Sequence, residues 1–129
     1  MIILTILWII YTVLDAITQA YYYDSNPNTH NIHWLFVAQR GIVLGALSLH
    51  LPTDYSLIEV GIFSVGLALI YSFFHNGTYY LTRHKLNNAI YPKGFWSDST
   101  SSTAIMEFNI KWRTAMAVVG FIFIYGLTL

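Results

Sequence analysis

Long apolar stretches alternate with short polar segments along this chain, and they predict its helices. A helix needs roughly 20 mostly apolar residues to cross the hydrocarbon core of a bilayer. Turn-forming residues at 24–28 end the first stretch, and Pro52 follows the second. We expect spanning helices over about residues 2–22, 32–51, 55–82 and 103–128. The pattern therefore predicts a single domain, residues 1–129: an all-α integral membrane protein with four transmembrane helices in an antiparallel up-down bundle.

A soluble helical bundle is the competing interpretation, and the apolar stretches argue against it. The helices of such a bundle carry a polar face that recurs every 3.6 residues. Residues 2–14, 58–74 and 114–129 have no such face. Charged residues make up only 9% of the chain, against about 25% in an average soluble domain, and hydrophobic residues make up 56%. We expect lipid, rather than a protein core, to cover this apolar surface.

Composition and motifs exclude several classes of site. The chain has no cysteine, which rules out disulfides, thiolate metal sites and a cysteine nucleophile. Its net charge of zero gives no electrostatic reason to expect a nucleic-acid partner. The first apolar stretch lacks the basic region and cleavage site of a secretory signal, so we expect a retained helix. The sequence also lacks the motifs of phosphate-binding loops, nucleophile elbows and calcium loops.

The basic residues lie toward one side of the predicted bundle. Three of them fall in the loop 83–102, and the others fall in the adjoining halves of the helices. The opposite side has only acidic groups, Asp54 and Glu59. The positive-inside rule then predicts a cytoplasmic loop 83–102 with both termini outside. Phe95 and Trp96 indicate that this loop lies on the membrane surface, where aromatic side chains are favoured.

Antiparallel helices bring polar residues from all four spans to one level of the bilayer. Asp15 and Arg40 stand out because each lies inside an apolar span, where an ionised side chain costs about 2.5–3.5 kcal/mol. Such groups pair with each other or face water, and we expect Asp15 to pair with Arg40; Arg113 is the alternative partner. The predicted polar cluster contains Asp15, Gln19, His33, Arg40, His75, Asn76, Glu107 and Arg113.

Two interpretations of this predicted polar cluster remain open. Intramembrane ionisable groups often mark a site for a substrate, an ion or a proton. A buried network of ion pairs and hydrogen bonds can equally serve helix packing. Four members are candidate metal ligands, namely Asp15, His33, His75 and Glu107, but the Glu-x-x-His motif of four-helix metal sites is absent. We therefore predict no metal and no other cofactor.

Two glycine patterns each have alternative interpretations. Gly41 and Gly45, together with Ala38, form a stripe of small residues that lets helices approach closely, within the bundle or between subunits. Gly77 follows two polar residues in the third span. It marks either a broken helix of the kind that lines transporter sites or an ordinary glycine of a membrane helix.

Helix starts can be placed from capping residues. Thr53 or Asp54 is suited to cap the third helix, and Ser56 and Glu59 have the spacing of a capping box. Thr103 is the expected cap of the fourth helix. The very short segment before the third helix indicates that the second and third helices are antiparallel neighbours.

These features favour a small multi-pass protein without enzymatic activity. We expect a structural or assembly subunit of a homo-oligomer or of a larger membrane complex, with the lipid bilayer and other membrane subunits as partners. Small cysteine-free proteins of this kind are common among viral membrane proteins. The alternatives are a channel, holin-like pore or small transporter, and an intramembrane metal-dependent enzyme. A pore needs polar groups in the outer half, where the sequence offers only Ser48, Ser56, Glu59 and Ser64.

Overall fold

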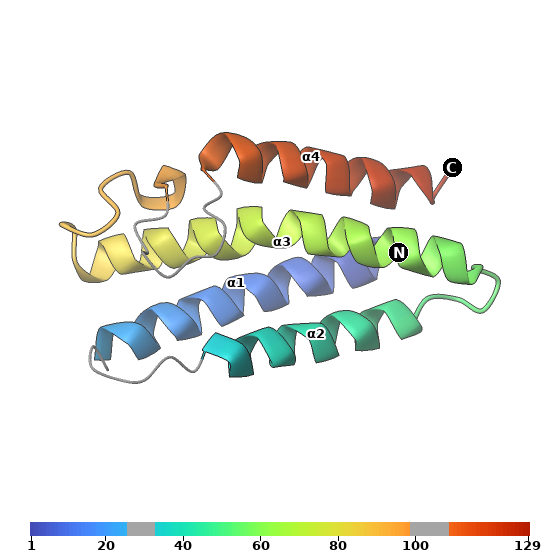
Figure 1. The fold of residues 1–129 in the computed structure, drawn as a ribbon, viewed down its shortest axis with the longest axis horizontal. Helices are drawn as coiled ribbons and strands as arrows, with labels where there is room; N and C mark the ends of the chain where they lie inside the picture. The colour runs from blue at the N-terminus through green and yellow to red at the C-terminus, as the bar shows by residue number, and fades with distance from the viewer. Residues whose placement is uncertain (26–32, 99–108) are drawn as a thin grey trace.

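The computed structural model describes residues 1–25, 33–98 and 109–129, and this part of the chain contains helices and no strand. The helices are α1 (Ile2–Ser25), α2 (His33–Leu49), α3 (Leu57–Leu86), the short 3-10 helix η1 (Gly94–Trp96) and α4 (Ile110–Gly126) (Figure 1). The predicted all-α class is confirmed. Two of the helices, α1 and α3, are long and apolar enough to cross a membrane.

Capping side chains decide where two of the helices begin. The Ser56 hydroxyl accepts the Glu59 backbone N–H, and the Glu59 carboxylate accepts the Ser56 backbone N–H at 2.7 Å. The predicted capping box is therefore present, and it starts α3 at Leu57. The Asn109 side chain accepts the Trp112 backbone N–H at 3.0 Å, so α4 begins at Ile110. Thr103, the predicted cap of this helix, lies outside the described residues.

Consecutive helices run in opposite directions, and α3 lies at the centre of the arrangement (Figure 1). Helix α1 packs against one side of α3, and α4 packs against another. Helix α2 lies beside α1 and α3, with less extensive contact to both. The alternating directions agree with the predicted up-down order. The packing differs from a square bundle because α3 is the shared partner and α4 packs mainly against α3 alone.

The contact between α3 and α4 is made close by two glycines that sequence reasoning did not single out. A Cβ atom added to Gly120 would lie 2.7 Å from the carbonyl oxygen of Gly66. A Cβ atom added to Gly66 would lie 2.8 Å from Ile124 Cγ1. By contrast, Gly41 and Gly45 have no atom within 4 Å of such a Cβ, so they make no close helix contact within the described chain. The glycines that bring helices together inside the molecule are Gly66 and Gly120.

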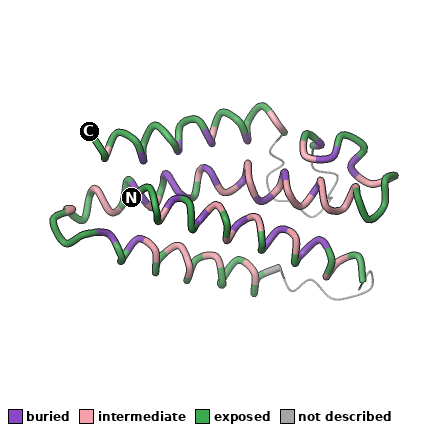
Figure 2. Tube along the Cα trace, turned by 180° about the vertical axis from the view of Figure 1, so that it is seen from behind, coloured by how far each residue is buried: buried purple, intermediate pink, exposed green. Residues whose placement is uncertain are grey.

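The surface of the described helices is rich in apolar side chains. Exposed positions lie on the outer faces of the helices, and buried positions line the faces between them (Figure 2). Large apolar side chains occupy exposed positions on all four α-helices. The buried apolar residues include Trp8, Phe63 and Leu67, and the Trp8 indole donates a hydrogen bond of 2.7 Å to the Leu67 carbonyl. The buried polar residues are Thr5, Thr12, Asp15, Gln19, Ser48, Ser72, His75, Ser97 and Arg113.

Candidate functional site

Three helices contribute to one buried group of polar side chains, which we call the Asp15 cluster: Asp15 and Gln19 of α1, Arg40 of α2 and His75 of α3. Arg40 Nε lies 2.9 Å from Asp15 Oδ2, so the ion pair favoured by the sequence is present. His75 Nε2 lies 3.2 Å from the same oxygen. The side chains of Asp15, His75 and Arg40 are 3%, 7% and 13% exposed, so water has little access to the pair.

His75 lies at the centre of the cluster. Its Nε2 atom lies 3.1 Å from Arg40 Nη2, 3.2 Å from Gln19 Nε2 and 3.2 Å from Asp15 Oδ2. On the other side of the ring, Nδ1 lies 3.1 Å from Asn76 Oδ1. His75 therefore has a polar neighbour at each of its ring nitrogens.

The remaining donors of the cluster also have partners. Gln19 Nε2 donates to Asp15 Oδ2 at 3.0 Å, one helical turn away on α1. Asn76 Nδ2 donates to the Ser72 hydroxyl at 3.2 Å, one turn away on α3. The Asp15 carboxylate is thereby surrounded by N–H groups from two helices. The opposite charges of Asp15 and Arg40 and these hydrogen bonds stabilise the buried network.

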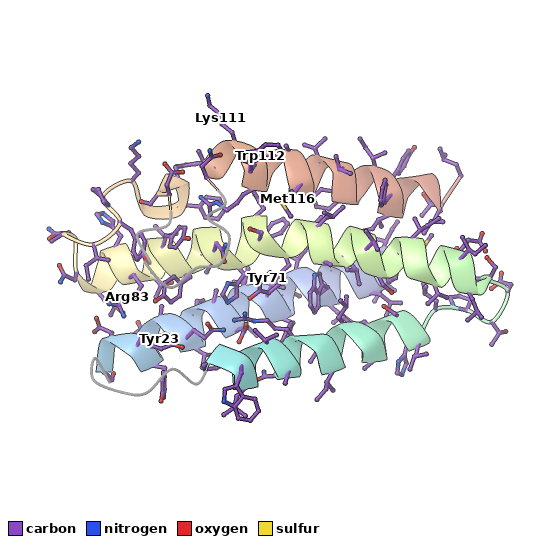
Figure 3. All side chains as sticks on the ribbon, viewed as in Figure 1. Tyr23, Tyr71, Arg83, Lys111, Trp112 and Met116 are labelled. Atoms are coloured by element: carbon purple, nitrogen blue, oxygen red, sulfur yellow. The ribbon has the colours of Figure 1, made fainter. Side chains whose placement is uncertain are left out.

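Tyr71 covers one side of the Asp15 cluster, between α3 and α1 (Figure 3). Its ring stacks on the His75 ring with centroids 4.7 Å apart, and Arg40 Cζ lies 5.0 Å from its centroid. The ring face therefore contributes a cation–π contact to the arginine. Sequence reasoning missed Tyr71. The available signal was its position one turn before His75 on the same helix.

A shallow groove of about 180 Å³ borders the cluster on the α2 side. Its lining is Trp8, Arg40, Gly41, Leu44, Ala68 and Tyr71. Arg40 is the one member of the Asp15 cluster in this lining, and its Nε is already engaged by Asp15. Most of the groove is therefore apolar, and it gives no direct access to the carboxylate or to His75.

Arg113 belongs to a different part of the molecule, so the alternative pairing of Asp15 with Arg113 is wrong. Its fully buried guanidinium donates from Nη2 to the carbonyl oxygens of Ser97 at 2.8 Å and Phe95 at 3.3 Å. Its Cζ atom lies 5.1 Å from the centroid of the Tyr80 ring. Arg113 therefore holds the η1 segment against α4. It does not pair with Asp15, because α4 lies across α3 from the Asp15 cluster.

The same segment packs closely on α3. A Cβ atom on Gly77 would lie 2.4 Å from the Phe95 ring, so this glycine makes room for that side chain. Helix α3 continues without interruption from Leu57 to Leu86 through Gly77. The broken-helix interpretation is therefore wrong. Gly77 serves the packing of η1, which no local sequence signal indicated.

Two predicted members of the cluster fall in parts of the chain without a described side chain. Glu107 and the side chain of His33 lie outside the described residues. Within the described residues, no group of three or more histidine, aspartate or glutamate side chains is positioned to share a metal ion. Asp15 and His75 are the candidate ligands that come together, and N–H donors from Arg40 and Gln19 already face their acceptor atoms. This donor set holds helices together and offers a metal no free pair of ligands.

A second polar contact joins α2 to α3 away from the Asp15 cluster. The Ser64 hydroxyl donates to the Ser48 hydroxyl at 2.7 Å, and the Ser48 hydroxyl in turn donates to the Leu44 carbonyl at 2.9 Å. Helix α2 is thus attached by hydrogen bonds at two levels, one at Arg40 and one at Ser48.

Comparisons with protein-family models, with curated proteins and with solved structures found no significant match.

Proposed function

We propose that the chain is an integral membrane protein whose four helices cross the bilayer. The observation that carries the proposal is the large exposed apolar surface of the helices. Only 33% of the most apolar window of α1 and 28% of that of α3 are buried, so neither resembles the covered core helix of a soluble protein. Exposed side chains include Ile3 at 73%, Ile58 at 75% and Ile122 at 61%. Lipid is the solvent that stabilises such a surface.

The charge distribution supports one orientation in the bilayer. The last turn of α3 carries Arg83, His84 and Lys85, and the first turn of α4 carries Lys111. These turns lie toward the same end of the bundle, where α3 extends beyond the start of α4 (Figure 1). The positive-inside rule places this end in the cytoplasm and both termini outside.

Within the membrane, we propose a structural or assembly role without catalysis. In the Asp15 cluster, donors and acceptors face one another inside the protein, so its chemistry is used to hold α1, α2 and α3 together. A channel or transporter needs polar groups that continue toward the other face. There, the Ser64 hydroxyl donates to the Ser48 hydroxyl, which in turn donates to the Leu44 carbonyl. This pattern favours packing over passage of an ion or substrate.

Helix α2 supports the assembly part of the proposal. Ala38, Gly41 and Gly45 are exposed on this helix, and the two glycines have open space where a side chain would be. Small residues let membrane helices approach closely, and α2 makes less contact with its own bundle than α1 or α4. We propose that a helix of a second copy, or of another membrane subunit, packs on this face.

Single-cysteine labelling tests membrane insertion and orientation, because the natural chain has no cysteine. We expect the protein to resist alkaline carbonate extraction. A membrane-impermeant maleimide added to intact cells should label Asp54→Cys, and should label Lys93→Cys only after permeabilisation. Extraction by carbonate would contradict the membrane proposal. Labelling in the opposite order would contradict the orientation alone.

Native mass spectrometry from a mild detergent tests assembly. Gly45→Leu should lower the population of the oligomer, or of a co-purified complex, on the order of tenfold, because the new side chain blocks the approach of another helix. Gly61→Leu is the matched control, since Gly61 is also exposed and a Cβ atom added to it would have no atom within 4 Å. A wild-type protein that is monomeric and has no partner contradicts the assembly role, as does an equal effect of both substitutions.

A further inference from the structure

We propose that the end of the bundle formed by α3, η1 and α4 binds the phosphate groups of anionic lipids. The binding groups are the ammonium groups of Lys85, Lys93 and Lys111, flanked by the indoles of Trp96 and Trp112. This inference rests on the proposed membrane insertion. It goes beyond that insertion, because a protein can cross a bilayer with no preference among headgroups. We call these five residues the headgroup surface.

The lysines of the headgroup surface are free to meet an external anion. All three are exposed, and none forms an ion pair within the described residues. The described carboxylates at this end form no ion pair with these lysines. Asp24 lies 3.9 Å from Arg83, and Asp98 accepts the Ile110 backbone N–H at 3.0 Å.

The headgroup surface is drawn from three separate segments that lie toward the same end of the bundle. Lys85 lies in the last turn of α3, Lys93 directly before η1, and Lys111 in the first turn of α4. In Figure 3, Lys111 extends from the start of α4 away from the bundle. Arg83 at this end is engaged with Asp24, so the three lysines supply the positive charge of this surface that has no partner within the described residues.

The scaffold beneath the headgroup surface holds η1 to both neighbouring helices. Arg113 donates to the Ser97 and Phe95 carbonyls from α4, and the Phe95 ring packs over Gly77 of α3. The Lys93 backbone N–H donates to the Ser97 hydroxyl at 3.1 Å. Lys93 is thus held in a defined position relative to α4. Arg113 is a positioning residue here, since its own guanidinium is fully buried and does not reach a headgroup.

Trp96 and Trp112 identify the membrane surface as the place of binding. They are 56% and 62% exposed, although tryptophan is a large and costly side chain to leave in water. Indole rings are favoured at headgroup level, where the ring meets lipid and the N–H meets polar groups. Residues 50–57, which form the turn at the opposite end, contain no lysine, arginine or tryptophan. The chemistry that favours anionic headgroups is confined to one end.

Lipid retention in native mass spectrometry tests the inference. The protein in mild detergent is mixed with equal amounts of phosphatidylglycerol and phosphatidylcholine, and the retained lipids are counted. We expect the wild type to retain the anionic lipid preferentially. The triple variant Lys85→Gln, Lys93→Gln, Lys111→Gln should lose this preference by roughly fivefold for each lysine, because a basic residue near an anionic surface contributes about that factor. The charge-retaining triple Lys→Arg variant is the matched control and should keep the preference.

Several outcomes would overturn the inference. Equal retention of the two lipids by the wild type contradicts it, and so does a preference that survives the glutamine substitutions. Displacement of the anionic lipid by millimolar glycerol phosphate would assign the site to a soluble phosphate instead of a lipid. If the glutamine variant loses helix content, lipid retention by the wild type is measured in about 1 M salt instead. Salt at this concentration screens the lysine charges, so the preference for the anionic lipid should disappear.

The failure of this inference is distinguishable from failure of the proposed function. Carbonate extraction is carried out on membranes that contain the wild type, the triple Lys→Gln variant or the triple Lys→Arg variant. A wild type that resists extraction but shows no lipid preference contradicts the headgroup surface alone. A wild type that is extracted contradicts membrane insertion itself. The glutamine variant should remain resistant, because its substitutions lie outside the apolar parts of the helices.

Discussion

Two arginines, the partly buried Arg40 and the fully buried Arg113, are accommodated in different ways. Arg40 is paired with the Asp15 carboxylate at 2.9 Å and also contacts His75 and the face of Tyr71. Arg113 is fully buried, yet its hydrogen-bond partners in the described chain are two backbone carbonyl oxygens. Its Nε and Nη1 atoms have no hydrogen-bond partner there. The Arg40 guanidinium is neutralised by the Asp15 carboxylate, whereas the Arg113 guanidinium is held by two backbone carbonyl dipoles and the face of the Tyr80 ring.

This difference corresponds to different structural roles. The pair formed by Arg40 and Asp15 connects α1 to α2, and His75 extends it to α3, so three helices depend on it. Arg113 connects a surface segment to one helix. A charge left without its partner in a low-dielectric interior is far more costly than a carbonyl left without a donor. We therefore expect larger effects from changes at the Asp15 cluster than from changes at Arg113.

Asp15→Asn should have the largest effect, because it leaves the Arg40 charge without its carboxylate. We expect a loss of about 3–5 kcal/mol in the free energy of unfolding, measured by circular dichroism during unfolding of the protein in mixed micelles. Arg40→Gln should also destabilise, and the double variant should recover part of the combined loss. Strictly additive losses would show that the two residues do not act as a pair.

Asp24→Asn is the matched control for this prediction. It makes the same change on the same helix, but the Asp24 side chain is 40% exposed and lies 3.9 Å from Arg83. Exposed pairs of this kind contribute about 0–1 kcal/mol. A loss in the free energy of unfolding as large as that of Asp15→Asn would contradict the prediction, because it would mean that burial of the carboxylate does not determine the cost of removing its charge.

Arg113→Met should have an intermediate effect, about 1–3 kcal/mol, because the carbonyls of Phe95 and Ser97 lose their donor. The effect should be local. We expect faster amide hydrogen exchange around η1, with no change in α1 or α2, measured by mass spectrometry in micelles. Lys111→Met, which alters an exposed residue of the same turn, should leave this exchange unchanged. Faster exchange throughout α1 and α2 would indicate that Arg113 supports the Asp15 cluster after all.

Gly77→Ala should have the smallest effect of the three, near 1 kcal/mol, because the Phe95 ring can move away from the new Cβ at the cost of packing. Gly61→Ala, with open space around the new atom, should be neutral or should stabilise the helix by up to about 1 kcal/mol. The same unfolding measurement distinguishes them. Equal stabilisation by both substitutions would show that η1 is not packed on α3.

Part of the candidate site could be predicted because the relevant signal is local. Asp15 and Arg40 are ionisable residues within apolar spans that are neighbours in sequence, and this made their pairing the preferred hypothesis. His75 was placed at the same level by the antiparallel order of the helices. Arg113 was placed at that level too, but its level along the helix does not say which neighbour it faces. Helix α4 packs on the side of α3 away from Asp15, so Arg113 meets the η1 segment instead.

Four helices, their alternating directions and the capping box at Ser56 could be predicted from the sequence, because apolar length, turn residues and cap spacing act over a few residues. Which arginine pairs with the carboxylate, which glycines bring helices together and how Gly77 accommodates Phe95 became known from the packed fold alone. Those outcomes depend on how each helix is rotated about its axis and which neighbour it packs against. That rotation is set by side-chain packing among α1, α3 and α4 together, so no single segment contains it.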